Sequence, residues 1–362
     1  MRRYYIDNIR SLCVLILFPH HTFMIYNTFG ESFYIKGADI QSLSFIITAI
    51  WPWIMPLMFL IAGVSTAYSL QKRTKREYIA ERLNRLLVPT IFGILLLVPI
   101  QTFFAEKFHN SYTGNYFEQY VLFFTKDTDL SGYHGGFTPA HLWYLIYLFV
   151  ISMVALLIIY LSQKSGIRLV VKKIPFVVLL SFFIIPAVSQ VILDLDGKSL
   201  GEYLAWFLLG YFVLSNDDVV EKVTKYRFLT LSIGVVLLVS YTFFGVALEE
   251  YNWVLFEVLY GLYAWVAILS IIGFGKRYLS GANRLSKYLS KHSFGIYFLH
   301  QQWIVVTAYF ALMWFENIVI QIVSVLLSSI VLTFFSDLIL SRIPFIRYIF
   351  GIKDKSKEIA NQ

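Results

Sequence analysis

Long apolar segments separated by short charged stretches constrain this sequence more than any other feature. The segments are 6–28, 43–70, 86–104, 140–162, 174–193, 200–216, 227–247, 252–274, 292–314 and 317–341. Most of them reach the roughly 20 apolar residues that a helix needs to cross a bilayer, and none alternates with period two as barrel strands do. Hydrophobic residues make up 58% of the chain and charged residues only 14%, which excludes a soluble globule. The pattern predicts an all-α polytopic membrane protein with about ten transmembrane helices.

The distribution of basic residues predicts the orientation of these helices. With the N-terminus in the cytoplasm, 26 of the 30 Lys and Arg residues fall in cytoplasmic loops or tails. The four exceptions are Lys36, Lys107, Lys126 and Lys198. Such asymmetry is typical of membrane proteins and predicts that both termini are cytoplasmic. The net charge of +8 is then explained by topology and attraction to a lipid bilayer, not by nucleic-acid binding.

The sequence predicts one transmembrane domain over residues 1–347 and a short basic cytoplasmic tail over 348–362. The first apolar segment imitates a signal peptide, but charges interrupt it and no cleavage site follows, so we expect a retained helix in the cell (cytoplasmic) membrane. The outer loop 105–139 is the largest polar stretch, and both a binding loop and a mobile connector fit it. With Cys13 as the only cysteine, we expect neither an intrachain disulfide nor a metal site.

The first apolar segment carries several polar residues on one predicted helical face. Asp7 and Arg10 are three residues apart, and His21 follows Arg10 by eleven residues, which returns it to within about 20° of the same direction. Eleven residues also place His21 about 16 Å deeper, near the middle of the bilayer. A titratable group at that depth favours a catalytic role, although a packing hydrogen bond between helices also fits. His20 points about 100° away, and Pro19 adds uncertainty to this geometry.

Two arginines stand where the third segment enters the membrane, in the pattern Arg82-x-x-Arg85-x-x-x-Pro89. Guanidinium groups three residues apart on a helix form a fork that suits phosphates. Ordinary positive-inside topology would also place arginines here. Both interpretations stay open on the residues alone.

A third polar stripe lies in the stretch SKHSFGIYFLHQQW. Ser293, Tyr297 and His300 follow an i, i+4, i+7 spacing. His300 is predicted to lie about 12 Å beyond His292, at a depth comparable with that of His21. The two histidines either share one catalytic site or each satisfy a packing bond. Tyr297 is a candidate donor to an oxyanion.

The stretch PAHLWYLIYLF opens a further helix at the outer interface with His141, Trp143 and Tyr144. Anchoring in the aromatic belt explains these residues, and stacking of Trp143 on a sugar acceptor is the alternative. Weaker candidates are acidic residues inside the spans, namely Glu202, Glu257 and Asp337.

Taken together and in order, these motifs resemble the acyltransferase 3 family of ten-helix membrane O-acyltransferases. The likeness runs from about Tyr4 to about Arg347 and includes the stretches FLIAG, HLWYL, WFLLGYFV and GIYFLH. Within the family, YYIDNIRSLCVLILFPHHTFMIY and HLWYLIYL are most similar to the glucan biosynthesis protein C, or succinyltransferase, branch.

The resemblance implies transfer of an acyl group from cytoplasmic acyl-CoA to a hydroxyl of an extracytoplasmic glycan or glycolipid. His21 matches the essential histidine of the family, and Arg82 and Arg85 match its paired arginines, which are associated with acyl-CoA. Acyl-CoA would be a co-substrate, so the resemblance implies no bound cofactor. One departure is Ala62, where the family commonly has a serine before the glycine.

The leading hypothesis is therefore a membrane O-acyltransferase that transfers acetyl or succinyl groups. His21 would be the base or transient acyl carrier, with Arg10 and His300 as catalytic partners. Arg82 and Arg85 would bind the donor, and Tyr297 and Trp143 would contact substrate. A proton-coupled transporter of a small metabolite or glycan precursor also explains ionisable residues in the membrane, as does a non-enzymatic scaffold or sensor.

Overall fold

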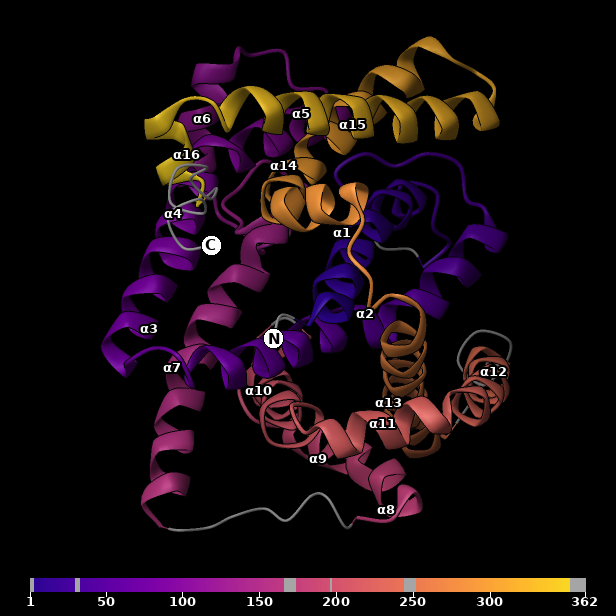
Figure 1. Cartoon of the computed structure of the whole chain (residues 1–362). Coiled ribbons are helices and arrows are strands. Elements are labelled where there is room, and N and C mark those ends of the chain that lie inside the picture. Colours follow the sequence, from indigo (N-terminus) through magenta and orange to yellow (C-terminus); the bar gives the residue numbers. More distant parts are fainter. Residues whose placement is uncertain (1–2, 30–32, 166–173, 196, 244–251, 352–362) are drawn as a thin grey trace. The chain divides into compact units, whose positions relative to one another are not determined.

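The computed structural model describes residues 3–29, 33–165, 174–195, 197–243 and 252–351. This part of the chain is almost wholly helical (Figure 1). Its only strands are β1 (Asp194–Leu195) and β2 (Lys198–Ser199), which pair as a short antiparallel ladder. The structure thus confirms the all-α class, while residues 352–362 of the predicted tail lie outside the described part.

The helices follow the predicted apolar segments. In order they are α1 (Tyr4–Met24), α2 (Gln41–Ser69), α3 (Lys75–Arg82), η1 (Leu83–Leu87), α4 (Val88–Leu96), α5 (Val98–His109), α6 (Tyr116–Thr125), η2 (Ala140–Leu142), α7 (Trp143–Lys164), α8 (Phe176–Leu180), η4 (Ser181–Phe183), α9 (Ile184–Ser189), α10 (Leu200–Leu209), η5 (Gly210–Leu214), α11 (Asp217–Lys225), α12 (Arg227–Thr242), α13 (Trp253–Tyr278), α14 (Arg284–Trp314), α15 (Ile318–Leu340) and α16 (Pro344–Ile349). Each of the ten predicted segments overlaps at least one of them.

The structure does not confirm the expected number of ten membrane spans. Within the described residues, six helices are long and apolar enough to cross a bilayer, and a seventh forms if α11 and α12, bent by 68°, count as one span. Two predicted spans contain the shorter apolar helices Phe176–Ser189 and Leu200–Leu214, which fall below the roughly 20 residues of a full crossing. The chain is a multi-pass membrane protein, and both the count of ten and the side of the termini stay predictions.

The chain divides into two compact units. The first unit comprises Met1–Cys13, Thr48–Glu81 and Tyr147–Ser290, and the second comprises Val14–Ile47, Arg82–Ile146 and Lys291–Gln362. Several helices, among them α1, α7 and α14, contribute residues to both. Each unit is described by itself below.

In the first unit, α2 meets α10 and η5 through two glycines. A Cβ atom on Gly63 would lie 1.9 Å from the carbonyl oxygen of Phe207, and one on Gly210 would lie 2.0 Å from that of Leu60. The contact is reciprocal, because each glycine faces a backbone carbonyl of the opposite segment. Close approach of this kind between membrane helices needs small residues at the crossing point.

Aromatic side chains join α13 to α12, α2 and α8 in the first unit. Tyr241 of α12 stacks on Tyr263 of α13 at 5.9 Å, and the Tyr263 hydroxyl donates to the Ala49 carbonyl at 2.7 Å. The Trp265 indole donates to the Leu179 carbonyl at 2.8 Å. These bonds satisfy the polar ends of the two side chains and so offset the cost of removing them from water.

In the second unit, α15 packs against α14 through a polar contact. His292 of α14 pairs with the carboxylate of Asp337, which is only 1% exposed. A Cβ atom on Gly295 would lie 1.9 Å from Asp337 Oδ1, so glycine is required for this approach. Trp303 also donates to Ser336 at 3.0 Å. This buried pair gives Asp337 a structural role, because it joins α15 to α14.

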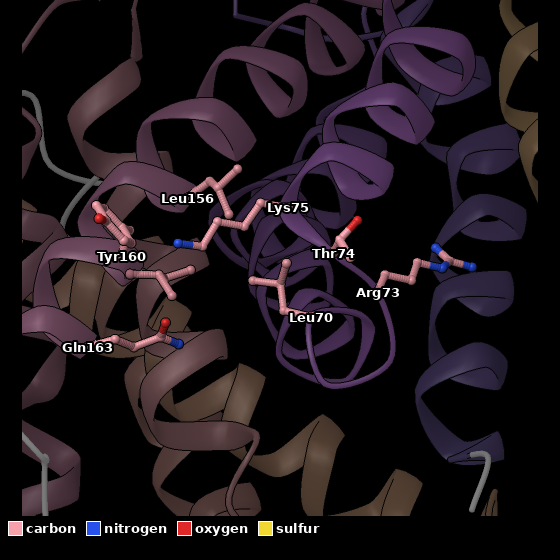
Figure 2. A pocket seen from close by; sticks show the side chains of 8 residues that line it. Leu70, Arg73, Thr74, Lys75, Leu156, Tyr160 and Gln163 are labelled. Carbon is pink, nitrogen blue, oxygen red and sulfur yellow. The ribbon is translucent and has the colours of Figure 1, made fainter.

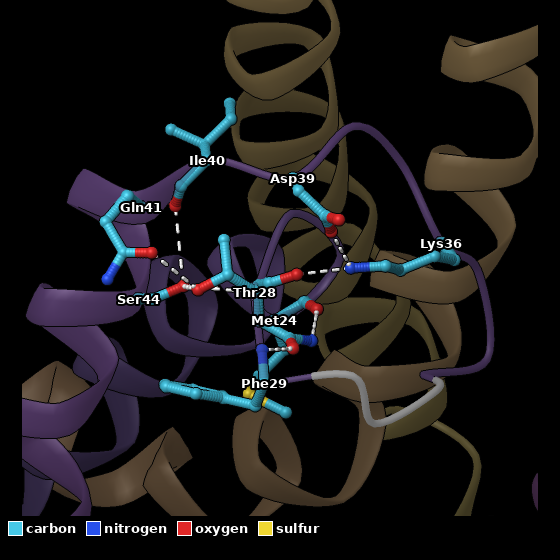
Figure 3. A network of polar contacts seen from close by, with 9 residues as sticks. Met24, Thr28, Phe29, Lys36, Asp39, Ile40, Gln41 and Ser44 are labelled. Carbon is cyan, nitrogen blue, oxygen red and sulfur yellow. Dashed lines mark hydrogen bonds and ion pairs between the residues drawn. The ribbon is translucent and has the colours of Figure 1, made fainter. Parts of the chain in front are cut away.

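The connection between α1 and α2 is held by a polar network in the second unit (Figure 3). The backbone N–H and the hydroxyl of Thr28 bond to Ser44 at 2.9 and 3.0 Å. Lys36 pairs with Asp39 at 2.6 Å and also donates to the Asn27 carbonyl. Asn27 in turn donates to the Met24 carbonyl at 2.6 Å. The network thus fixes the end of α1, where the histidines lie.

Candidate active site

Four histidine rings from three segments of the second unit converge. His20 and His21 lie near the end of α1, His141 lies in η2 just before α7, and His300 lies in α14. The ring centroids of His20 and His21 are 5.2 Å apart, those of His21 and His300 are 5.3 Å apart, and those of His141 and His300 are 5.2 Å apart. The structure thus brings His21 and His300 together and adds His141. We call these four residues the histidine cluster.

Two members of the histidine cluster have a defined tautomer. His141 Nε2 lies 3.1 Å from the Phe298 carbonyl oxygen, and His300 Nδ1 lies 2.5 Å from that of Tyr297. A carbonyl oxygen can only accept, so these two ring nitrogens carry the protons. The other nitrogens, His141 Nδ1 and His300 Nε2, then carry lone pairs. Both are buried and have no hydrogen-bond partner among the described residues.

His21 differs from its neighbours in accessibility. His300 is fully buried, and His20 and His141 are each 7% exposed, whereas His21 is a partly exposed residue. Its Nδ1 is nevertheless buried without a hydrogen-bond partner in the described part of the chain. His21 is therefore the member of the cluster that is most accessible to a substrate, although its Nδ1 atom is buried and unpaired among the described residues.

A strained turn orients His141. Ala140 has a φ of 48°, a left-handed conformation that costs a non-glycine residue about 1–2 kcal/mol. The Thr138 hydroxyl accepts the Ala140 N–H at 2.9 Å and stabilises the turn. The Tyr297 hydroxyl donates to the His141 carbonyl. In this structure Tyr297 thus holds the turn in place, and strain of this kind is common beside functional groups.

An aromatic group covers His21 from the loop that follows α1. The Phe33 ring stacks on His21 at 6.0 Å with an interplanar angle of 11°, and it also contacts Tyr34 and Tyr133 at 5.4 and 6.3 Å. His109 Nε2 donates to the Phe33 carbonyl at 2.8 Å. Burial raises the pKa of the Tyr34 phenol, which keeps it neutral. We call Phe33, Tyr34 and Tyr133 the aromatic roof.

Polar contacts join residues within the predicted loop 105–139. Lys126 pairs with Glu106 at 3.1 Å, and Gln119 donates to the Gly135 carbonyl at 3.1 Å. Gly135 has a φ of +79°, and a Cβ atom there would lie 2.5 Å from Glu106 Oε2, so only glycine fits. The predicted loop 105–139 is therefore an ordered element in its described geometry, with α6 at its centre.

The predicted donor-site arginines lie in the same unit as the histidine cluster. Arg82 is the last residue of α3, and Arg85 lies in η1, a π-helical turn. Arg85 is exposed and Arg82 is partly exposed. Single π-helical turns within α-helices occur frequently at functional sites. Arg85 is thus accessible to a ligand, whereas Arg82 is accessible only in part, with its Nε buried.

The structure gives the other predicted residues different surroundings. Arg10 belongs to the first unit, where it donates to Ser65 at 2.7 Å and pairs with Asp7 at 3.3 Å. Trp143 is partly exposed at the start of α7, and Cys13 is buried. No group of three or more His, Cys, Asp or Glu residues in the described part of the chain has the arrangement of a metal site.

Sequence reasoning missed two parts of this site. It assigned His141 to the outer interface or a stacking position, because nothing in its spacing indicates a partner on α14. It also gave no role to Phe33, which lies in a connection with no helical periodicity. The strained turn before His141 follows a proline and a threonine, residues typical of turns, but that signal does not identify a catalytic cluster.

Comparison with known proteins adds an independent observation to this geometry. Residues 3–340 match the acyltransferase domain of the acyltransferase 3 family. No curated protein and no solved structure gives a significant match. The family match covers nearly every span and includes all four members of the histidine cluster. The chain therefore belongs to the acyltransferase 3 family and is a membrane acyltransferase that transfers groups other than aminoacyl groups.

Proposed function

We propose that this protein transfers an acyl group from cytoplasmic acyl-CoA to a hydroxyl of an extracytoplasmic glycan or glycolipid, with His21 as the base. The observation that carries the proposal is the accessible ring of His21 beside the unpartnered lone pairs of His141 and His300. Family membership supports acyl transfer over the transporter and scaffold alternatives. The donor, the acceptor and the role of each residue are parts of the proposal.

In the proposal, Arg82 and Arg85 bind the phosphates of the CoA donor. Guanidinium groups form forked, charge-assisted hydrogen bonds with phosphate oxygens. The exposure of Arg85 and its place in a π-helical turn support a binding role. Similarity to the glucan biosynthesis protein C branch makes succinyl-CoA the first donor to test, with acetyl-CoA as the second.

The histidine cluster would prepare His21 for proton transfer. His300 Nε2 can accept a hydrogen bond from His21 Nδ1–H, and a modest rotation of the His21 ring would satisfy both buried nitrogens. That bond leaves the lone pair of His21 on Nε2. When His21 Nε2 takes a proton, the new imidazolium is stabilised by the neutral acceptor behind it. His300 therefore acts on the reaction through His21.

The proposed chemical step has one bond made and one bond broken at the acyl carbon. The acceptor hydroxyl loses its proton to His21 Nε2 as its oxygen attacks the thioester carbonyl. The tetrahedral intermediate then expels the CoA sulfur, which takes the proton back from His21. The products are an ester and free CoA. Transient acylation of His21 would divide the same transfer into two steps.

The remaining predicted residues would position these groups. Tyr297 would hold the turn that contains His141, because its hydroxyl donates a hydrogen bond to the His141 carbonyl. Arg10 would have a positioning role, because it pairs with Asp7 of α1 and donates a hydrogen bond to Ser65 of α2. Trp143 is proposed as a stacking surface for a sugar ring, which its partial exposure permits.

Mass spectrometry of envelope glycans tests the proposed reaction. Cells that make the wild-type protein should contain glycans carrying added acetyl or succinyl groups, and cells that make His21→Ala should lack them. Cells that make His20→Ala are the matched control and should keep them. Identical glycan masses with and without the wild-type protein would contradict the proposed acceptor class.

A further inference from the structure

A cavity of about 300 Å³ lies within the first unit, between the end of α2, the start of α3 and the C-terminal half of α7 (Figure 2). Its polar wall includes Arg73, Lys75 and Gln163, and its apolar wall includes Leu70 and Leu156. None of the side chains that line it in the described part of the chain is acidic. The cavity therefore suits a ligand that is both anionic and partly apolar.

Among the residues that line the cavity, Lys75 is best placed to bind an anion. Its Nζ lies 3.6 Å from the ring centroid of Tyr160, a cation–π contact that fixes the side chain while leaving its N–H groups for other partners. Figure 2 shows Lys75 extending towards Tyr160 and Arg73 pointing away from them. Arg73 is already paired with Glu81, so Lys75 carries the uncompensated charge.

The apolar side of the cavity continues onto an exposed surface of α7. Leu156 is 9% exposed at the cavity wall, whereas Leu157 and Leu161 are 58% and 53% exposed beside Tyr160. In a membrane helix, exposed leucines of this kind face lipid chains. A ligand with its anionic group at Lys75 could therefore extend an acyl chain along Leu157 and Leu161.

The predicted side of the membrane agrees with such a ligand. The loop between α2 and α3 contains Lys72 and Arg73, and α3 begins with Lys75 and Arg76. The positive-inside rule assigns this basic stretch to the cytoplasmic face. Anionic lipids attract basic residues at that face, and basic pockets between membrane helices bind phosphate headgroups. We infer that this cavity binds the phosphate headgroup of an anionic phospholipid through Lys75, independently of the proposed acyl transfer.

Native mass spectrometry of the full-length protein in nanodiscs or detergent tests this inference with phosphatidylglycerol as the probe and phosphatidylcholine as the uncharged comparison. Lys75→Gln should lower the retention of phosphatidylglycerol about five- to ten-fold and leave that of phosphatidylcholine unchanged. Lys72→Gln is the matched control, because it removes an equal charge three residues away, and Lys72 does not line the cavity. It should change retention less than two-fold by the same reasoning about surface charge.

Tyr160→Leu provides a second variant that keeps every charge. It removes the ring that holds Lys75 and should also lower phosphatidylglycerol retention, which general attraction of the loop to anionic lipid would not do. Equal losses in Lys75→Gln and Lys72→Gln, or no loss in Tyr160→Leu, would overturn the inference. Weakened acyl-CoA binding in Lys75→Gln with unchanged lipid retention would also overturn it, by assigning the cavity to the donor nucleotide.

Discussion

The imidazole rings of His21 and His300 lie with their centroids 5.3 Å apart, although they come from helices near opposite ends of the chain. His21 Nδ1 and His300 Nε2 are both buried without hydrogen-bond partners among the described residues. An unsatisfied buried polar atom costs about 1–3 kcal/mol, and each of these two neighbouring rings contains one. A hydrogen bond between them would remove both costs and fix the tautomer of His21.

His300→Ala should therefore lower kcat about 100-fold, because His21 loses the acceptor that orients it and stabilises its protonated form. The dissociation constant for acyl-CoA should stay within two-fold or so of wild type, since His300 is not expected to contact the donor. His300→Gln should recover part of the loss, because its side-chain oxygen can accept the same bond. Kinetics with purified protein check this, and a wild-type kcat in His300→Ala would refute the pairing.

Arg82→Ala and Arg85→Ala should each weaken acyl-CoA binding by about ten- to a hundred-fold, the loss of one charge-assisted contact worth about 1.5–3 kcal/mol. Lysine at either position should restore binding only in part, because it lacks the planar fork. Arg76→Ala is the control, since Arg76 lies one turn or more away in α3 and is exposed. If all three alanine variants bind acyl-CoA equally, the two arginines serve topology alone.

Gly63→Ala should destabilise the first unit, because its new Cβ atom would lie 1.9 Å from the Phe207 carbonyl oxygen. Overpacking at such a contact costs about 1–3 kcal/mol or more. Gly234→Ala is the matched control in a helix interior, where the nearest atom, on Val266, lies 3.7 Å away. Thermal unfolding in detergent should show a lower Tm for the first variant and an equal or higher Tm for the second. Equal Tm values would contradict the close crossing.

Both termini should be cytoplasmic, as the asymmetry of basic residues predicts. A reporter fused after Gln362 should give a cytoplasmic signal, and the same reporter inserted between Thr113 and Gly114, in the connection between α5 and α6, should give an extracytoplasmic one. An even number of spans is required for this result. An extracytoplasmic signal from the first fusion would show that one predicted span does not cross the membrane.

The sequence predicted the helical class because apolar composition and length alone decide it. It could not predict the number of crossings, since the apolar segments 174–193 and 200–216 contain helices that are shorter than a full span. The bend of 68° between α11 and α12 was also hidden, because Tyr226 at the break is neither glycine nor proline.

The candidate site could be predicted only where local spacing carries information. The spacing from Arg10 to His21 predicts that His21 lies deep in the membrane, and the same argument predicts a similar depth for His300. Both depths stay predictions, and α1 is not among the six described helices that are long and apolar enough to cross a bilayer. That the two histidines face each other depends on packing between α1 and α14, which no local pattern encodes. His141 and Phe33 reach His21 through a strained turn and a loop, where helical periodicity does not apply.

The most direct test of the account is the initial rate of acyl transfer by His21→Ala, measured in proteoliposomes that present acyl-CoA on one side and an oligosaccharide acceptor on the other. A base acting directly in the reaction contributes about 10²–10⁴-fold, so the rate should fall by at least that lower bound while acyl-CoA binding stays near wild type. His20→Ala, the neighbouring control, should keep most of its activity. A His21→Ala rate comparable with wild type would contradict the central claim, and loss of activity in His20→Ala alone would assign the base to the other ring.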